Sequence, residues 1–482
     1  MASRSRSFTA DVLKLVTGTT LAQVITILAS PLLTRLYGPE AFGFLALFTS
    51  ITSIIGVLVC MRYELAIMLP KTDEEAANLL ILSLLSVGVV SGLTVPALYL
   101  SSDTLLSLLR TPDLAPYLIL VPPFVFVSGI FLALNYWNSR TRQFGRLSVA
   151  RVTSSLTTTG TQLGGGFAGY ATGGGLIGAS MLGSLVSTVV LGGQIWRDDR
   201  ILLYKSFSWK GILAGLRRYK KFPLFDSTSA ILDAVSWQLP VLLLATFFSP
   251  IVVGFYALGF RVLQLPMSLV GSAIAQVFFQ RAAEAYKSGD LAPFVQNIVT
   301  VLLRIIVFPM LLLAIVGPDI FIVVFGEEWG EAGVYIQILS VWAIFWFLYS
   351  PVSTIYVVLE KQKFGLIFNI FNILTCSLSL LIGGTIGSVF LALTLFSLSG
   401  AAVYAAFCIL LMTRSGIALR DSIQIFARTL AYSVPGLGIL LLIKFMTLNR
   451  LIVVLASIIL LVMYYVSIYV VDPQTSEILS RS

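Results

Sequence analysis

LIVVLASIILLVMYYVSIYV, residues 451–470, is a run of twenty residues without a charge. A helix of about 20 apolar residues spans the hydrocarbon core of a bilayer. Similar apolar runs fall at about 12–36, 41–61, 78–100, 114–137, 147–170, 174–195, 222–248, 251–277, 294–316, 333–358, 365–387, 389–412 and 428–446. Together they predict an all-α polytopic membrane protein with 14 transmembrane helices and short connections.

The composition points the same way. Of 482 residues, 57% are hydrophobic and 11% are charged, and the mean hydropathy is +0.96. Soluble proteins carry about 25% charged residues, so a soluble enzyme and a disordered chain are both excluded. The absence of His and the presence of only three Cys exclude a His/Cys metal centre, a Ser-His-Asp triad and a disulfide scaffold. We therefore expect neither a metal site nor a cofactor.

The basic residues predict the orientation. Most of the 31 Lys and Arg fall in segments on the same side as the two termini, and only Arg35, Arg110 and Arg450 fall in the opposite segments. Because cytoplasmic loops are rich in Lys and Arg, we expect both termini in the cytoplasm and the protein in the plasma (inner) membrane. This distribution accounts for the net charge of +9 without a nucleic-acid partner. The Thr-rich first run favours a retained span over a signal peptide.

Two short motifs recur in the chain. Pro39-x-x-x-Gly43-Phe44 returns as Pro250-x-x-x-Gly254-Phe255, and Phe144-Gly145 returns as Phe364-Gly365. Both pairs map a predicted helix onto the sixth helix after it. We therefore predict two six-helix lobes related by a parallel pseudo-repeat, plus a C-terminal helix pair. The predicted boundaries are 1–221 for the N-lobe with a basic linker, 222–412 for the C-lobe, and 413–482 for the extra pair and a cytoplasmic tail.

Charged residues within or beside spans are the candidate binding groups. Arg261, Arg304 and Asp233 lie near the centre of their predicted spans. Asp226 lies nearer the inner face and shares a helix face with Asp233 by its i, i+7 spacing. Guanidinium groups in the membrane suit an anionic, phosphate-bearing substrate. Alternatively, Asp233 pairs with Arg261 or Arg304 as a structural contact.

Three further charged residues lie at span ends. Arg62 and Glu64 flank the inner end of the second span, and Arg35 lies near the outer end of the first. We predict that Arg35 and Arg62 bind substrate, and that Glu64, with Asp226 and Asp233, couples an ion or forms a charge pair. The alternative for the two arginines is that their side chains extend to lipid head groups.

Polar and aromatic residues could contact sugars. The candidates are Trp137, Asn138 and Gln238, while a Trp near a span end is more often an interface anchor. The basic, amphipathic stretch 203–221 is typical of a helix on an anionic leaflet, so we expect anionic lipids as partners. The glycine-rich stretch 160–193 indicates close helix packing rather than a phosphate loop.

Several motifs together resemble a known family. They are Leu33-Thr34-Arg35-Leu36-Tyr37-Gly38-Pro39, Arg62-Tyr63-Glu64-Leu65-Ala66, Asn135-Tyr136-Trp137-Asn138 with Arg140, Tyr219-Lys220-Lys221-Phe222-Pro223 and Phe325-Gly326-x-x-Trp329. In this order they resemble the polysaccharide transporters of the MOP exporter superfamily, the Wzx-type O-antigen flippases. The resemblance covers residues 31 to about 365. The extra helix pair is similar to that of the related lipid II flippases.

The resemblance implies a function. It implies that two lobes form a cleft and that a polyprenyl-diphosphate-linked oligosaccharide crosses the membrane by alternating access, without covalent chemistry. It also implies that cationic cavity residues bind the diphosphate; Arg35 and Arg62 lie in matched motifs and Arg261 follows one. Transport would be driven by the membrane potential or by H⁺ or Na⁺. We expect a monomer, with other polysaccharide-assembly proteins as possible partners.

Other functions stay open. The same fold could export lipid II or a small drug-like solute, although two central Arg against one Asp disfavour a cationic solute. A membrane glycan polymerase or ligase would need a sizeable outer loop with catalytic groups, and the acidic loop at about 317–332 is short. The charges at the centre of the spans disfavour a purely structural scaffold.

Overall fold

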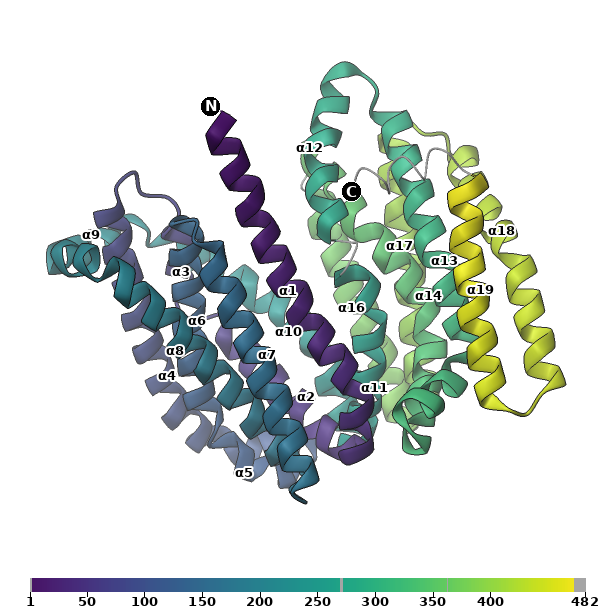
Figure 1. Ribbon diagram of the computed structural model, residues 1–482, viewed down its shortest axis with the longest axis horizontal. Helices are drawn as coiled ribbons and strands as arrows, with labels where there is room; N and C mark the ends of the chain where they lie inside the picture. Colours follow the sequence, from purple (N-terminus) through teal and green to yellow (C-terminus); the bar gives the residue numbers. More distant parts are fainter. Residues whose placement is uncertain (1, 269–271, 362, 472–482) are drawn as a thin grey trace. The chain divides into compact units, whose positions relative to one another are not determined.

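The computed structural model describes residues 2–268, 272–361 and 363–471, and no β-strand occurs among them (Figure 1). The chain divides into two compact units, residues up to Gly254 and residues from Phe255 onward. Long apolar helices without strands are what a lipid-exposed chain requires, because each helix satisfies its own backbone hydrogen bonds. The predicted boundaries at 221 and 412 stay predictions.

The first unit holds the elements that build the candidate site. They are α1 (Ala2–Leu36), α2 (Pro39–Gly56), α3 (Tyr63–Ala66), α4 (Asp73–Leu109), η1 (Pro112–Leu114), α5 (Ala115–Leu118), α6 (Val121–Arg140), α7 (Phe144–Phe167), α8 (Gly173–Ser206), α9 (Trp209–Arg218), the π-helical turn η2 (Phe222–Asp226) and α10 (Ser227–Phe247). Within this unit α1 packs along α7, α7 along α8, and α10 against α2 and α4.

The second unit takes up the rest of the chain. Its elements are most of α11 (Pro250–Leu263), α12 (Ser272–Ser288), α13 (Leu291–Phe325), η4 (Glu327–Trp329), α14 (Gly330–Val352), α15 (Ile355–Val358), α16 (Lys363–Ile386), α17 (Val389–Arg414), α18 (Leu419–Met446) and α19 (Arg450–Val471). The closest packing is between α13 and α14, and α14 and α16 both pack on α17.

The structure does not confirm the predicted count of 14 spans. In the described part of the chain, 11 helices are long and apolar enough to cross a membrane, and the bent pair Pro112–Leu118 and Val121–Arg140 would make 12. The helix α7 is absent from this set because its 24 residues include Arg146, Arg151 and many Thr. The helix α11 ends at Leu263, short of the predicted span 251–277. The pseudo-repeat likewise stays a prediction.

The recurring Pro-x-x-x-Gly motifs lie against each other. A Cβ atom at Gly43 would overlap the carbonyl oxygen of Pro250, and a Cβ atom at Gly254 would overlap that of Pro39. At this reciprocal crossing the first turns of α2 and α11 approach so closely that only glycine fits. The spacing shared by the two motifs therefore has a packing reason.

A break in α13 explains the charge that α18 carries inside a span. Val316 has non-helical dihedral angles (φ −118°, ψ 17°), and Pro318 has no N–H to donate to the carbonyl of Ala314. The Gln337 amide donates to the carbonyls of Ala314 and Ile315. Lys444 Nζ of α18 donates to Ile315 O at 2.7 Å and pairs with Asp319 Oδ2 of α13 at 2.9 Å. The helix pair α18–α19, which packs along α13 (Figure 1), thus completes the hydrogen bonding of α13.

The basic stretch 203–221 forms the short amphipathic helix α9. Ser208 caps its N-terminus, and Ile212 is buried against α4. Trp209, Leu213 and Leu216 are exposed together with the flanking basic residues. A helix with exposed apolar and basic side chains suits the interfacial region of a membrane.

Candidate functional site

Arg62 occupies a strained turn between α2 and α3. Met61 and Arg62 have positive φ angles of 52° and 61°. A left-handed backbone costs a non-glycine residue about 1–2 kcal/mol, and such strain concentrates at functional sites. The turn places the Arg62 side chain beside the first turns of the α10 segment.

There Arg62 meets two carboxylates. Its Nε atom donates to Asp226 Oδ2 at 2.6 Å, and its NH1 atom lies 3.6 Å from Glu64 Oε1. The side chains of Arg62, Asp226 and Glu64 are 25%, 43% and 1% exposed. The structure therefore brings together three of the predicted site residues. Two of them, Arg62 and Asp226, are 164 positions apart in the sequence.

Asp226 ends the π-helical turn η2. The π-helix is rare and occurs mostly as single turns at functional sites. A pocket of about 340 Å³ lies at this turn and is lined by Lys221, Phe222, Phe225, Asp226 and Ser229. The lining combines a cation, a carboxylate, a hydroxyl group and two aromatic rings. Such a surface can bind a phosphate at one end and an apolar or ring-shaped group at the other.

Arg140 fixes the segment that carries the site. Its guanidinium group donates to the carbonyls of Ile67, Pro70 and Thr72 at 2.9–3.1 Å and pairs with Asp73 at 3.0 Å. The side chain is only 12% exposed. Arg140 therefore ties the end of α6 to the loop between α3 and α4. The motifs that contain Arg62, Arg140 and Phe222 thus lie close together around α3.

Burial shifts the pKa of Glu64. Desolvation raises the pKa of Glu64 above its ordinary value, a hydrogen bond from its own backbone N–H and the charge of Arg62 lower it in part, and Asp226 raises it. Glu64 Oε2 is buried and has no hydrogen-bond partner in the described part of the chain. A buried carboxylate oxygen without a hydrogen bond is costly, which acts in the same direction as the desolvation that raises the pKa.

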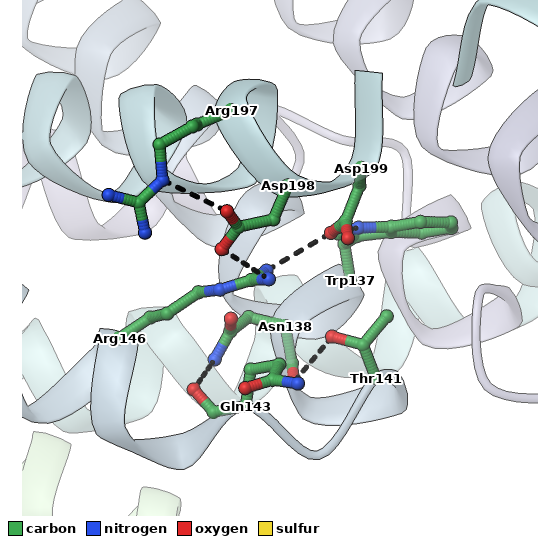
Figure 2. A network of polar contacts seen from close by, with 8 residues as sticks. All are labelled: Trp137, Asn138, Thr141, Gln143, Arg146, Arg197, Asp198 and Asp199. Carbon is green, nitrogen blue, oxygen red and sulfur yellow. Dashed lines mark hydrogen bonds and ion pairs between the residues drawn. The ribbon is translucent and has the colours of Figure 1, made fainter. Parts of the chain in front are cut away.

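Trp137 and Asn138, the predicted sugar contacts, lie in a buried polar network in this structure, and a contact with substrate stays a prediction (Figure 2). Both are 0% exposed. Trp137 Nε1 donates to Asp199 Oδ2 at 3.0 Å, and the Asn138 amide donates to the carbonyl of Gln143 at 2.7 Å. Arg146 bridges Asp198 and Asp199 at 3.0 Å each. These contacts hold α6, α7 and α8 together, so we expect a structural role for the two residues.

We expect Trp137→Phe to cost about 1–2 kcal/mol of stability, because it removes one hydrogen bond to a charged group. Transport per folded protein should not change. The melting temperature and the transport rate of the purified protein test this. Reduced transport at an unchanged melting temperature would contradict a structural role.

The other first-unit candidates lie apart from this cluster. Gln238 is half-buried and accepts a hydrogen bond from Ser50 Oγ at 2.9 Å, which joins α10 to α2. Asp233 is exposed on α10, two turns beyond Asp226. Arg35 is exposed in the last turn of α1. Whether these three residues bind substrate stays a prediction.

Arg261 and Arg304 belong to the second unit. Arg261 is half-buried near the end of α11. Arg304 is half-buried on α13, where its carbonyl accepts a hydrogen bond from Tyr464 of α19 at 2.9 Å. One turn on, the Phe308 ring stacks on Tyr464. Because residues i and i+4 share a helix face, Arg304 lies on the side of α13 that faces α19. We leave Arg304 out of the proposed binding set.

Sequence reasoning missed most of the pocket. Phe222, Phe225, Asp226 and Ser229 follow the i, i+3, i+4, i+7 spacing of a single helix face, directly after Lys221. This spacing is visible in the sequence. It does not predict a pocket, because the face of an apolar span normally lies against lipid or in the core. Within the described residues, no group of three His, Cys, Asp or Glu could hold a metal ion.

The comparisons with known proteins agree with this fold. A sequence model of a family described as "Polysaccharide biosynthesis protein" matches residues 32–334. The teichuronic acid biosynthesis protein TuaB of Bacillus subtilis (strain 168) is 25% identical over 158 residues, which cover 32% of this chain and 32% of TuaB. The chain thus matches about a third of the length of this relative.

Two solved structures are similar over almost their whole length. The lipid II flippase MurJ, in an inward closed conformation, has a TM-score of 0.73 and 14% identity, covering 94% of this chain and 98% of MurJ. An inward-facing MATE family multidrug resistance transporter of the MOP superfamily has a TM-score of 0.60 and 16% identity, covering 84% and 94%. At these identities the similarity shows the fold alone, and the many long apolar helices support an integral membrane protein.

Proposed function

Because the chain belongs to the family of polysaccharide biosynthesis proteins, we propose that it is a flippase for a lipid-linked saccharide. The substrate is a polyprenyl-diphosphate-linked oligosaccharide, the repeat unit of an O-antigen or a similar surface polysaccharide. It moves from the inner to the outer leaflet of the plasma membrane by alternating access. No covalent chemistry takes place, so the protein is not an enzyme.

The observation that carries the proposal is the position of Arg62 beside the pocket at η2. Arg62 and Lys221 supply two cations next to the Asp226 carboxylate, and Phe222 and Phe225 supply apolar surface. Phe225 is 70% exposed, so a prenyl chain could lie against it. A diphosphate linked to a prenyl chain combines the two kinds of group that this lining can bind.

Binding requires that Arg62 change its partner. In the structure the Arg62 Nε atom is engaged by Asp226, and an arriving diphosphate would compete for the same guanidinium group. Guanidinium suits this exchange because it stays charged and presents a planar fork of donors to phosphate oxygens. The pocket of about 340 Å³ is at the lower end of small-molecule sites, so it holds part of the head group rather than the whole oligosaccharide.

Charge also gives the transport a direction. Each negative charge that leaves a cell with a negative interior gains about 2.3 kcal/mol per 100 mV. The two negative charges of a diphosphate would gain about 4–5 kcal/mol. H⁺ or Na⁺ is the alternative coupling ion. In this proposal α9 lies on anionic lipids of the inner leaflet, and the protein acts as a monomer beside other polysaccharide-assembly proteins.

Flipping in proteoliposomes tests the proposed function. The substrate is a fluorescent polyprenyl-diphosphate oligosaccharide, and the readout is its accessibility to an impermeant quencher, with and without an imposed potential. We expect faster transfer between leaflets than in protein-free liposomes, and a dependence on the potential. Transfer of lipid II or of a cationic drug, but not of the oligosaccharide lipid, would contradict the proposed substrate.

A further inference from the structure

Two prolines interrupt the hydrogen bonding of α13, and each frees one backbone carbonyl. Pro309 and Pro318 both lie inside this helix. A proline has no N–H for the carbonyl four residues earlier, so the carbonyls of Ile305 and Ala314 lose their helical donors. In the hydrocarbon core of a membrane no water replaces these donors, and neighbouring helices must supply them.

The C-terminal helix pair supplies the donor at the first proline. The Tyr465 hydroxyl of α19 donates to Ile305 O at 2.8 Å, and this is the carbonyl that Pro309 leaves free. The ring of the adjacent Tyr464 stacks on Phe308, with 4.3 Å between the ring centroids. A side chain of α19 thus stands in for the missing N–H of α13.

The second break is held from two sides. On α14, the Gln337 amide donates at 3.1 Å to Ala314 O, the carbonyl that the second proline leaves free. On α18, Lys444 Nζ donates to Ile315 O at 2.7 Å and pairs with Asp319 Oδ2 at 2.9 Å. These two partners of Lys444 lie on opposite sides of the non-helical residue in α13, so one ammonium group bridges the break.

We propose that the helix pair α18–α19 is a clamp that sets the bend of α13. Tyr465 holds the helix at its first proline and Lys444 holds it at the second, about 13 Å further along the helix axis. Both are positioning residues, because they act on the backbone of α13. Helices bend most sharply at such proline breaks, so the strength of the clamp sets how readily α13 changes shape during transport.

A packing role alone predicts a different behaviour. The helix pair also contacts α13 through an apolar cluster that includes Leu312, Leu437 and Val453. If these apolar contacts were the whole attachment, the effect of removing a polar donor would not depend on the prolines of α13. In a clamp, the donor matters because the proline beneath it has left a carbonyl free.

A double-mutant cycle tests this dependence at the first proline. Tyr465→Phe removes one hydrogen bond, so the equilibrium constant for unfolding in mixed micelles should rise about fivefold. Pro309→Ala restores the N–H that Ile305 O lacks, so Tyr465→Phe should have little effect in that background. The control is Tyr432→Phe, which removes a hydroxyl bonded to Ser467 within the helix pair at 2.9 Å and should act equally in both backgrounds. The same effect of Tyr465→Phe with and without Pro309→Ala would show packing alone.

Distance measurements test the bend itself. Spin labels at Gln296 and Glu328, which are exposed near the two ends of α13, report its end-to-end distance by double electron–electron resonance. The three native cysteines are buried and need no replacement. We expect one narrow distribution in wild type, and in Lys444→Met a fall of about 10- to 100-fold in the ratio of that distance to others. Lys444→Arg keeps a charged donor and should retain the wild-type distribution.

The outcomes of this measurement are separate from the proposed function, because no substrate is present. An unchanged distribution in both Lys444→Met and Tyr465→Phe would overturn the clamp. If Lys444→Met does not fold, Tyr465→Phe decides alone, since it removes a single hydroxyl group. A shift in Tyr432→Phe as large as that in Tyr465→Phe would also count against the clamp.

Discussion

Replacing Arg62 by Ala is expected to reduce surface-glycan output by about 10- to 100-fold, while the amount of protein in the membrane stays unchanged. A hydrogen bond to a charged group contributes about 1.5–3 kcal/mol, which corresponds to this range of affinities. Arg62→Lys should give an intermediate output, because an ammonium group keeps the charge but loses the planar fork. Glycan output normalised to the protein content of membranes measures the effect.

A matched control shows whether the position of Arg62 matters. Lys71 is an exposed basic residue shortly after α3, and we expect Lys71→Ala to keep the wild-type output. The double variant Arg62→Ala/Glu64→Gln removes the buried carboxylate together with its cation, so it tests whether a loss of output comes from misfolding. An equal loss in Lys71→Ala and Arg62→Ala would contradict a specific role for Arg62.

Arg140→Gln is expected to lower the free energy of unfolding by about 3 kcal/mol, because three carbonyls and Asp73 lose a largely buried donor. Transport should fall as well, since Arg140 fixes the loop that follows α3. The melting temperature and the flipping rate of the purified variant measure the two effects.

The comparison for this variant is Arg142→Gln, two residues further on. Arg142 is exposed, so the substitution changes charge without removing buried contacts. Its φ angle of 58° is in the left-handed region for Arg and for Gln alike. We expect a change in stability within about 0.5 kcal/mol. If both variants lost stability equally, the contacts of Arg140 would not be what holds the loop.

The sequence alone predicts most of the helices, for a clear physical reason. In lipid, an apolar run of about 20 residues has few alternatives to a helix, so the runs from 78–100 to 451–470 correspond to helices of the structure. The predicted spans and the structure differ where the sequence is less apolar or is interrupted by proline. The helix α7 carries Arg and Thr, and α11 ends before Pro266, so hydrophobicity alone does not establish that either is a full span.

The site was predictable in part. Arg62, Glu64 and Asp226 were identified by their cost in an apolar chain, but not as neighbours, because 164 residues separate Arg62 from Asp226. The i, i+7 rule related Asp226 to Asp233 on one helix and could say nothing of a contact with α3. The burial of Trp137 and Asn138 was not predictable, because the sequence at the end of a span does not show whether a residue faces a cleft or, as here, a buried polar network.

Photocrosslinking locates the bound lipid most directly. The probe is a polyprenyl-diphosphate saccharide with a diazirine group next to the diphosphate, activated in proteoliposomes and mapped by mass spectrometry. Our account predicts adducts at Arg62 and in the η2 segment, with Phe222 and Phe225 among the labelled residues, and their loss in Arg62→Ala. Adducts confined to the second unit, around Arg261 or Arg304, would contradict it.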